Sequence, residues 1–159
     1  MGNIYEDRRL YADEFSGHAQ QILFDQYGDP CAKGWGALWL LNWKVQKHFA
    51  WFPATTICIH KNFQPGLFNA FKHLENLNLH LEIKTFDEAY CIRFISGSSS
   101  VLSAHSWGAA IDLNADKNPL GSSGTWSEEF ISVMLQNGIF CGQSWVGRKD
   151  PMHFAMVNG

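Results

Sequence analysis

Two short segments constrain the fold of this chain more than any other feature. The first is the run S-A-H-S-W-G-A-A-I-D from Ser103 to Asp112, and the second is D-P-M-H-F from Asp150 to Phe154. After Gly108, and again around His153, small or apolar side chains alternate with polar ones, as they do in a half-buried strand. The pattern therefore predicts two strands that each direct a polar side chain away from their apolar face.

Glycine and proline set the local geometry of both segments. Gly108 permits a turn after His105 that a residue with a Cβ atom would resist. Pro151 biases the preceding Asp150 toward an extended conformation. From that conformation the Asp150 carboxylate can reach back toward a metal bound by His153. We therefore expect the polar side chains of the two segments to converge on one site.

The polar side chains of these segments match the donor set of a catalytic metal site. A catalytic zinc ion takes three N or O ligands from the protein and keeps one position for water. His105, Asp112 and His153 would supply these ligands, and Asp150 would accept a proton from the water. The sequence therefore predicts one Zn2+ per chain with Asp150 as the catalytic base. The alternative for Asp150 is an exposed carboxylate that caps or orients a neighbour.

The S-x-H-x-x-G-x-A-x-D element followed by D-x-x-H-F resembles the zinc peptidases of family M15. This family includes D-Ala-D-Ala carboxypeptidases and L-Ala-D-Glu endopeptidases of bacterial cell walls, and many phage endolysins. The resemblance runs from about Lys47 to the C-terminus, and Arg93 fits the family's substrate arginine. It implies bacterial peptidoglycan as the partner and substrate. It also implies the fold shared by hedgehog proteins and D-Ala-D-Ala peptidases.

Arg93, Ser103, Trp107 and Trp145 are the candidate substrate-binding residues. The forked donors of Arg93 suit a substrate carboxylate or a developing oxyanion, which makes Arg93 a second candidate catalytic residue. The alternative for Arg93 is a surface ion pair. Ser103 has no base to activate it, so we expect it to donate a hydrogen bond to the substrate or to a metal ligand. Trp107 and Trp145 could wall the cleft, although large aromatic residues also pack in cores.

Periodicity and turn signals predict an α+β fold, with a small antiparallel sheet and helices packed mainly on one side. We expect helices over residues 5–27 with a break near Gly17, over 35–48 and 65–77, and from a capping box at Thr125 and Glu128 to Gln136. We expect strands over residues 56–60, 79–86 and 88–95, around His105 to Asn114, and near the C-terminus. Residues 1–44 are predicted to be a helical N-terminal extension packed on a zinc peptidase domain, residues 45–159.

Composition excludes several classes of partner. The chain has 159 residues and a formal net charge of −3. It lacks the Lys and Arg clusters of nucleic-acid-binding proteins. Its most hydrophobic stretch, residues 35–43, is much shorter than the ~20 residues of a membrane helix, so we expect no stable membrane insertion. A monomer is the expected state. The cysteines are widely spaced, which predicts free thiols: Cys31, Cys58, Cys91 and Cys141.

These features predict a zinc-dependent peptidoglycan peptidase, an L-Ala-D-Glu endopeptidase that serves as a phage or prophage lysis protein. Residues 1–15 are charged and lack the apolar run of a signal peptide. We therefore expect synthesis in the bacterial host cytoplasm and action on the cell wall after release or as a virion component. Two alternatives remain open. One is a D-Ala-D-Ala carboxypeptidase or dipeptidase, and the other is a non-catalytic, zinc-stabilised binding module.

Overall fold

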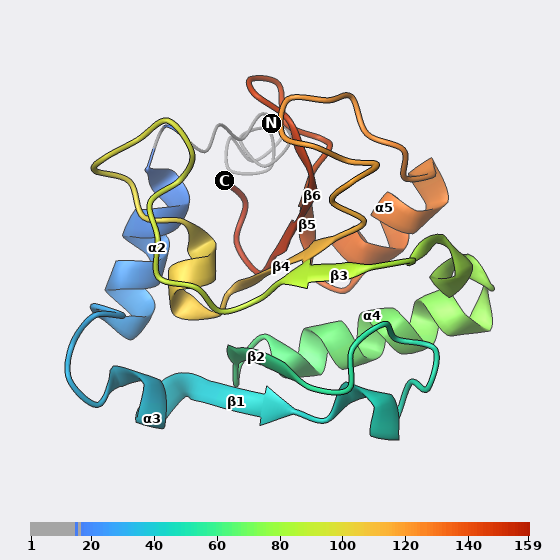
Figure 1. Ribbon diagram of the computed structural model, residues 1–159, viewed down its shortest axis with the longest axis horizontal. Helices are drawn as coiled ribbons and strands as arrows, with labels where there is room; N and C mark the ends of the chain where they lie inside the picture. The colour runs from blue at the N-terminus through green and yellow to red at the C-terminus, as the bar shows by residue number, and fades with distance from the viewer. Residues whose placement is uncertain (1–14, 16) are drawn as a thin grey trace, which may run out of the picture.

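The computed structural model describes Phe15 and residues 17–159, and it confirms the predicted α+β class (Figure 1). The described strands form two antiparallel sheets. In the smaller sheet, β1 (Leu40–Trp43) pairs with β2 (Ile57–His60). The larger sheet has the order β3-β4-β6-β5 and comprises β3 (Phe86–Glu88), β4 (Ala110–Leu113), β6 (Asp150–Ala155) and β5 (Phe140–Gly142).

Two of the described helices begin at a start signal in their sequences. The described helices are α2 (His18–Tyr27), α3 (Trp35–Trp39), α4 (Gln64–Asn76) and α5 (Glu128–Gln136). Pro65 lies in the first turn of α4, where a missing N–H breaks no helical hydrogen bond. Ser127 caps α5, because its Oγ accepts a hydrogen bond from the Phe130 N–H at 3.1 Å. The predicted cap at Thr125 is therefore wrong by two residues.

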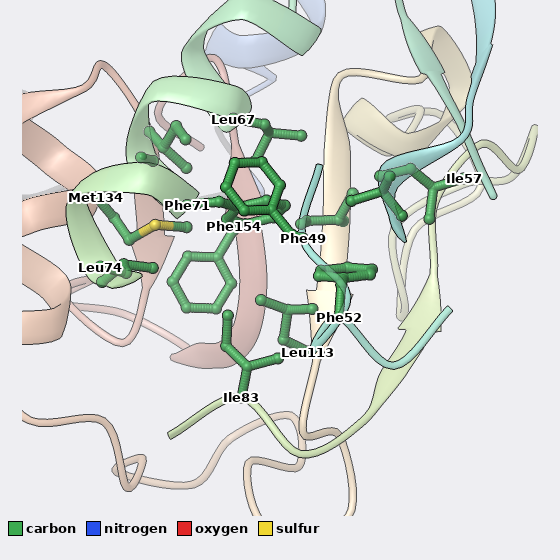
Figure 2. Close-up of a cluster of buried hydrophobic side chains, with 14 of the residues drawn as sticks. Phe49, Phe52, Ile57, Leu67, Phe71, Leu74, Ile83, Leu113, Met134 and Phe154 are labelled. Carbon is green, nitrogen blue, oxygen red and sulfur yellow. The ribbon is translucent and has the colours of Figure 1, made fainter. Parts of the chain in front are cut away.

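The main core lies between α4, α5 and one face of the larger sheet (Figure 2). Its fully buried side chains come from both helices and from the two central strands: Leu67, Phe71, Leu74, Met134, Leu113 and Phe154. Ile111 pairs with Phe154 across β4 and β6, so these two side chains share the core face. Because side chains alternate along a strand, Asp112 and its partner His153 face the opposite side.

The N-terminal helices cover this opposite side. In Figure 1, α2 lies beside the 3-10 turn η4 (Ala104–Trp107). Leu23 of α2 packs with Trp35 and Trp107 in a second buried cluster. The Trp107 indole N–H donates to the Gly28 carbonyl at 2.9 Å, which ties the turn to the end of α2. The division at residue 44 stays a prediction, and the helix predicted for residues 5–14 falls outside the described part of the chain.

Four further predictions of local structure are wrong. The helix predicted over 35–48 ends at Trp39 and continues as β1, because pairing with β2 satisfies its backbone. The segment 79–86 begins with the 3-10 turn η3 (Leu79–Glu82). In the segment 88–95, only Glu88 at the end of β3 and an isolated bridge between Phe94 and Leu102 form strand pairs. His105 lies in η4 and not in a strand.

Candidate metal centre

The structure brings the three predicted metal ligands together. Asp112 on β4 lies directly opposite His153 on β6, and η4 places His105 beside them. Asp112 Oδ1 is 3.1 Å from His105 Nε2 and 3.6 Å from His153 Nδ1. The ligand atoms of the three residues all lie within 4.8 Å of one another. Tetrahedral zinc with bonds of ~2.0–2.2 Å separates its ligand atoms by about 3.3 Å, so this spacing suits the metal.

Two residues shape the turn that holds His105. Ser103 is the N-cap of η4, and its Oγ accepts a hydrogen bond from the His105 N–H at 3.3 Å. Gly108 ends the turn at φ +63°, and a Cβ atom there would lie 2.7 Å from the His60 nitrogen. Ser103 is buried and acts on the backbone of a ligand residue. Its predicted hydrogen bond to substrate stays a prediction.

The hydrogen bonding of His105 fits a cation at this site. His105 Nδ1 lies 2.7 Å from the Ala89 carbonyl oxygen, so Nδ1 carries the proton of the neutral ring. Nε2 then presents a lone pair to Asp112 Oδ1 at 3.1 Å. Two acceptors at that distance need a proton or a cation between them. A carbonyl that fixes the outer nitrogen of a histidine is the usual support for a metal-binding imidazole.

The charge state of Asp112 also suits a ligand. Burial raises the pKa of this carboxyl group, because a charge loses its hydration in the interior. The close contacts of the carboxyl group with the His105 and His153 rings outweigh burial and lower the pKa of Asp112 well below its ordinary value. The carboxylate therefore stays ionised, as a metal ligand must.

Asp150 begins β6 and is half-buried. A regular strand would place Asp150 and His153 on opposite faces, since they are three residues apart. However, the register shifts here: Cys141 of β5 pairs with Phe154, whereas the next residue, Gly142, pairs with Asp150. Such an irregularity re-aims side chains near functional sites. A Cβ on Gly142 would overlap the Asp150 carbonyl oxygen, so glycine permits this close approach. The role of Asp150 as base stays a prediction.

Glu88, which no sequence motif singles out, lies between Arg93 and the candidate metal ligands. Arg93 Nη2 is 2.7 Å from Glu88 Oε2, and the same oxygen is 3.7 Å from His105 Nε2. Glu88 pairs with Asp112 across β3 and β4, so Glu88, Asp112 and His153 form a row across three adjacent strands. No ligand-like motif surrounds Glu88 in the sequence. Only the pairing of β3 with β4 reveals its position.

The two candidate aromatic residues are buried and support the site by packing. Trp107 has no exposed surface and makes an edge-on ring contact with Phe24. Trp145 is also buried, and its ring lies 5.5 Å from that of His153. The structure thus favours the packing alternative for both residues, and a substrate contact for either stays a prediction.

All four cysteines are free thiols, as predicted. Burial and the nearby Glu88 carboxylate raise the pKa of the Cys91 thiol, which does not favour a nucleophilic role.

Within the described part of the chain, none of the helices combines the length and apolarity needed to cross a bilayer.

Residues 96–156 match a family model described as D-alanyl-D-alanine carboxypeptidase. The matched segment contains the three candidate ligands and Asp150. No curated protein and no solved structure matches the chain significantly. The match confirms the predicted resemblance to peptidase family M15 over residues 96–156.

Proposed function

We propose that this protein is a zinc-dependent peptidase that hydrolyses an amide bond in the stem peptide of peptidoglycan. The observation that supports this most strongly is the convergence of His105, Asp112 and His153 within the segment that matches a peptidase model. Two imidazoles and one carboxylate leave a tetrahedral zinc ion one position for water or substrate.

The chain supplies the remaining groups that amide hydrolysis needs. Zinc bound by the three ligands would polarise the scissile carbonyl and lower the pKa of a water molecule toward ~7. Asp150 accepts the proton of the attacking water and delivers it to the leaving amine. Arg93 binds a carboxylate of the substrate or the oxyanion that develops during attack. Ala89 holds the His105 ring with Nε2 directed at the site.

Within this class we propose an L-Ala-D-Glu endopeptidase that acts in phage or prophage lysis. The resemblance of the two metal-bearing elements to those of phage endolysins supports this assignment. The enzyme would be made in the host cytoplasm and would meet the wall after release or as part of a virion. The second candidate is a D-Ala-D-Ala carboxypeptidase, which the description of the matched family model favours.

Digestion of purified peptidoglycan, followed by mass spectrometry of the released ends, tests these proposals. An endopeptidase leaves L-Ala as a new C-terminus and D-Glu as a new N-terminus. A carboxypeptidase instead releases free D-Ala. His153→Ala is the control, because it removes a ligand from the centre. If the zinc-loaded protein cleaves no bond in walls from several bacteria, the peptidase proposal is wrong and the binding-module alternative is supported.

A further inference from the structure

Glu88 lies between the candidate metal ligands and Arg93. Its Oε2 atom is 3.7 Å from His105 Nε2 on one side and 2.7 Å from Arg93 Nη2 on the other. Among the described residues, the group whose ligand atoms all lie within 4.8 Å of one another does not include Glu88. The Glu88 carboxylate is therefore engaged chiefly by the guanidinium, and it occupies the boundary between the metal centre and the half-exposed Arg93.

The side chain of Arg93 is held along one edge. Glu88 accepts hydrogen bonds from Nη2 at 2.7 Å and from Nε at 3.3 Å to Oε2 and 3.4 Å to Oε1. The opposite edge carries Nη1, which has a bond of only 3.4 Å to the Phe94 carbonyl. A guanidinium has five donors in a planar fork, so the Glu88 contact leaves hydrogens of Nη1 and Nη2 for another acceptor.

The backbone of Arg93 is fixed to the turn that bears His105. Ser106 Oγ accepts from the Arg93 N–H at 3.1 Å and donates to the Arg93 carbonyl at 3.1 Å. The Ser103 N–H also donates to this carbonyl at 2.9 Å. Because both its backbone and one guanidinium edge are anchored, Arg93 has little freedom to swing away from the metal ligands.

Charge gives Glu88 a second effect on Arg93. A divalent cation held by His105, Asp112 and His153 would repel a guanidinium nearby. The Glu88 carboxylate lies on the side of Arg93 that faces His105 and offsets this repulsion. A neutral residue at position 88 would form no ion pair with Arg93 and would not offset the repulsion by the cation. The guanidinium would then turn toward solvent.

We propose that Glu88 is a positioning residue that holds Arg93 beside the metal centre, with its free guanidinium edge presented to a carboxylate or oxyanion of the substrate. This proposal rests on the proposed peptidase function for its consequence, but the pairing itself is independent of that function. Glu88 acts through Arg93, so its loss should have no effect once Arg93 is absent.

A double-mutant cycle on the zinc-loaded full chain tests this dependence. The variants are Glu88→Gln, Arg93→Ala and the double variant, with peptidoglycan as substrate. We expect kcat/KM to fall 10- to 100-fold in each single variant and no further in the double variant. Zinc should stay at one per chain in all three. Multiplicative losses would overturn the proposal, because Glu88 would then act on the reaction without Arg93. Loss of zinc from Glu88→Gln would overturn it by making Glu88 a ligand.

Asp87→Asn is the matched control. It removes the same charge from the neighbouring residue of β3, whose carboxylate is exposed and accepts from the Ala115 N–H at 2.9 Å. We expect its kcat/KM to stay within about twofold of the parent protein. A loss equal to that of Glu88→Gln would mean that net charge, and not the pairing with Arg93, determines the effect, and this would overturn the proposal.

NMR of arginine labelled with 15N at Nε tests the pairing without any need for activity. The chain has four arginines, and Arg93→Ala identifies the Arg93 signal. We expect a slowly exchanging Arg93 Nε–H in the parent protein and in Asp87→Asn, and rapid exchange in Glu88→Gln. If exchange is unchanged in Glu88→Gln, the positioning role is wrong. If exchange behaves as expected while the parent protein digests no peptidoglycan, the pairing is supported and only the proposed peptidase function fails.

Discussion

The backbone N–H of His60 donates a 2.8 Å hydrogen bond to the carbonyl of Gly108. This bond joins the last residue of β2 to the loop between His105 and Asp112, and so it links the smaller sheet to the candidate metal centre. The close approach requires a residue without a side chain. At position 108 a Cβ would lie 2.7 Å from the His60 nitrogen and 2.8 Å from Leu40 Cδ2.

Gly108→Ala should therefore destabilise the protein and disturb the metal centre. We expect the free energy of unfolding to fall by about 3–4 kcal/mol, because a positive φ and a steric clash both oppose the Cβ. Zinc affinity should fall as well, since the turn that holds His105 must shift. Denaturant unfolding and a zinc titration measure the two effects.

Gly138→Ala is the control for the cost of the left-handed backbone conformation alone. Gly138 has φ +78°, and a Cβ atom at this position would meet no other atom within 4 Å, so only the left-handed conformation opposes the substitution. A loss of about 1 kcal/mol with normal zinc binding is expected there. Equal losses in the two variants would show that the contact between Gly108 and His60 contributes nothing.

Leu23→Ala tests whether α2 is an integral part of the fold. Leu23 is fully buried against the cluster that contains Trp107, so its truncation should cost about 2–5 kcal/mol of stability. Leu38→Ala removes the same atoms from a side chain that is 67% exposed, and it should change stability by less than about 0.5 kcal/mol. Thermal unfolding of both variants measures the two losses of stability. Similar small changes would mean that α2 packs only loosely.

The convergence of the candidate metal ligands could be predicted because local sequence determines their chemistry and their orientation. Asp112 and His153 each lie at a strand position whose side chain faces away from the apolar side, and Gly108 marks the turn beside His105. Residue types and short spacings thus predict the candidate ligand set and the two strands that carry Asp112 and His153. Neither depends on knowing where the rest of the chain lies.

Glu88 and the strand β1 could not be predicted in this way. Glu88 becomes part of the site only because β3 pairs with β4, a contact between segments distant in sequence. The apolar run 35–43 is compatible with a buried helix or a buried strand, and pairing with β2 decides in favour of a strand for its second half. Trp107 was ambiguous because burial by α2 is also a long-range contact.

His60 should make stability depend on pH. The ring is fully buried among Tyr27, Trp35 and Trp39. Burial, and then the charge of Lys61, lower the pKa of His60 to about 4. In the unfolded chain the pKa is about 6.5, so between these values the unfolded state binds more protons and stability rises with pH. Acidification from about pH 6.5 to pH 4 should cost about 3 kcal/mol through this residue.

Urea unfolding across this pH range compares the parent protein with His60→Gln and with the exposed-residue control His48→Gln. The pH dependence should be shallower in His60→Gln and unchanged in His48→Gln. An NMR titration of the His60 ring in the parent protein gives the same information directly. A ring that takes up its proton near pH 6.5 would show that burial does not control it.

Asp150→Asn should separate catalysis from metal binding. Asparagine is nearly isosteric with aspartate but cannot accept the proton of the attacking water. We expect zinc to stay bound while kcat falls by about 10²–10⁴, with little change in KM. Loss of zinc would make Asp150 a ligand. Survival of both zinc and rate would assign the base to another carboxylate.

The zinc content of the purified protein tests the central claim most directly. Elemental analysis of the parent chain, His153→Ala and the exposed-residue control His48→Ala measures whether His105, Asp112 and His153 form one metal site. We predict about one zinc per chain in the parent protein and in His48→Ala, and a loss of most of it in His153→Ala. Full zinc occupancy in His153→Ala, or a parent protein that binds no zinc, would contradict the account.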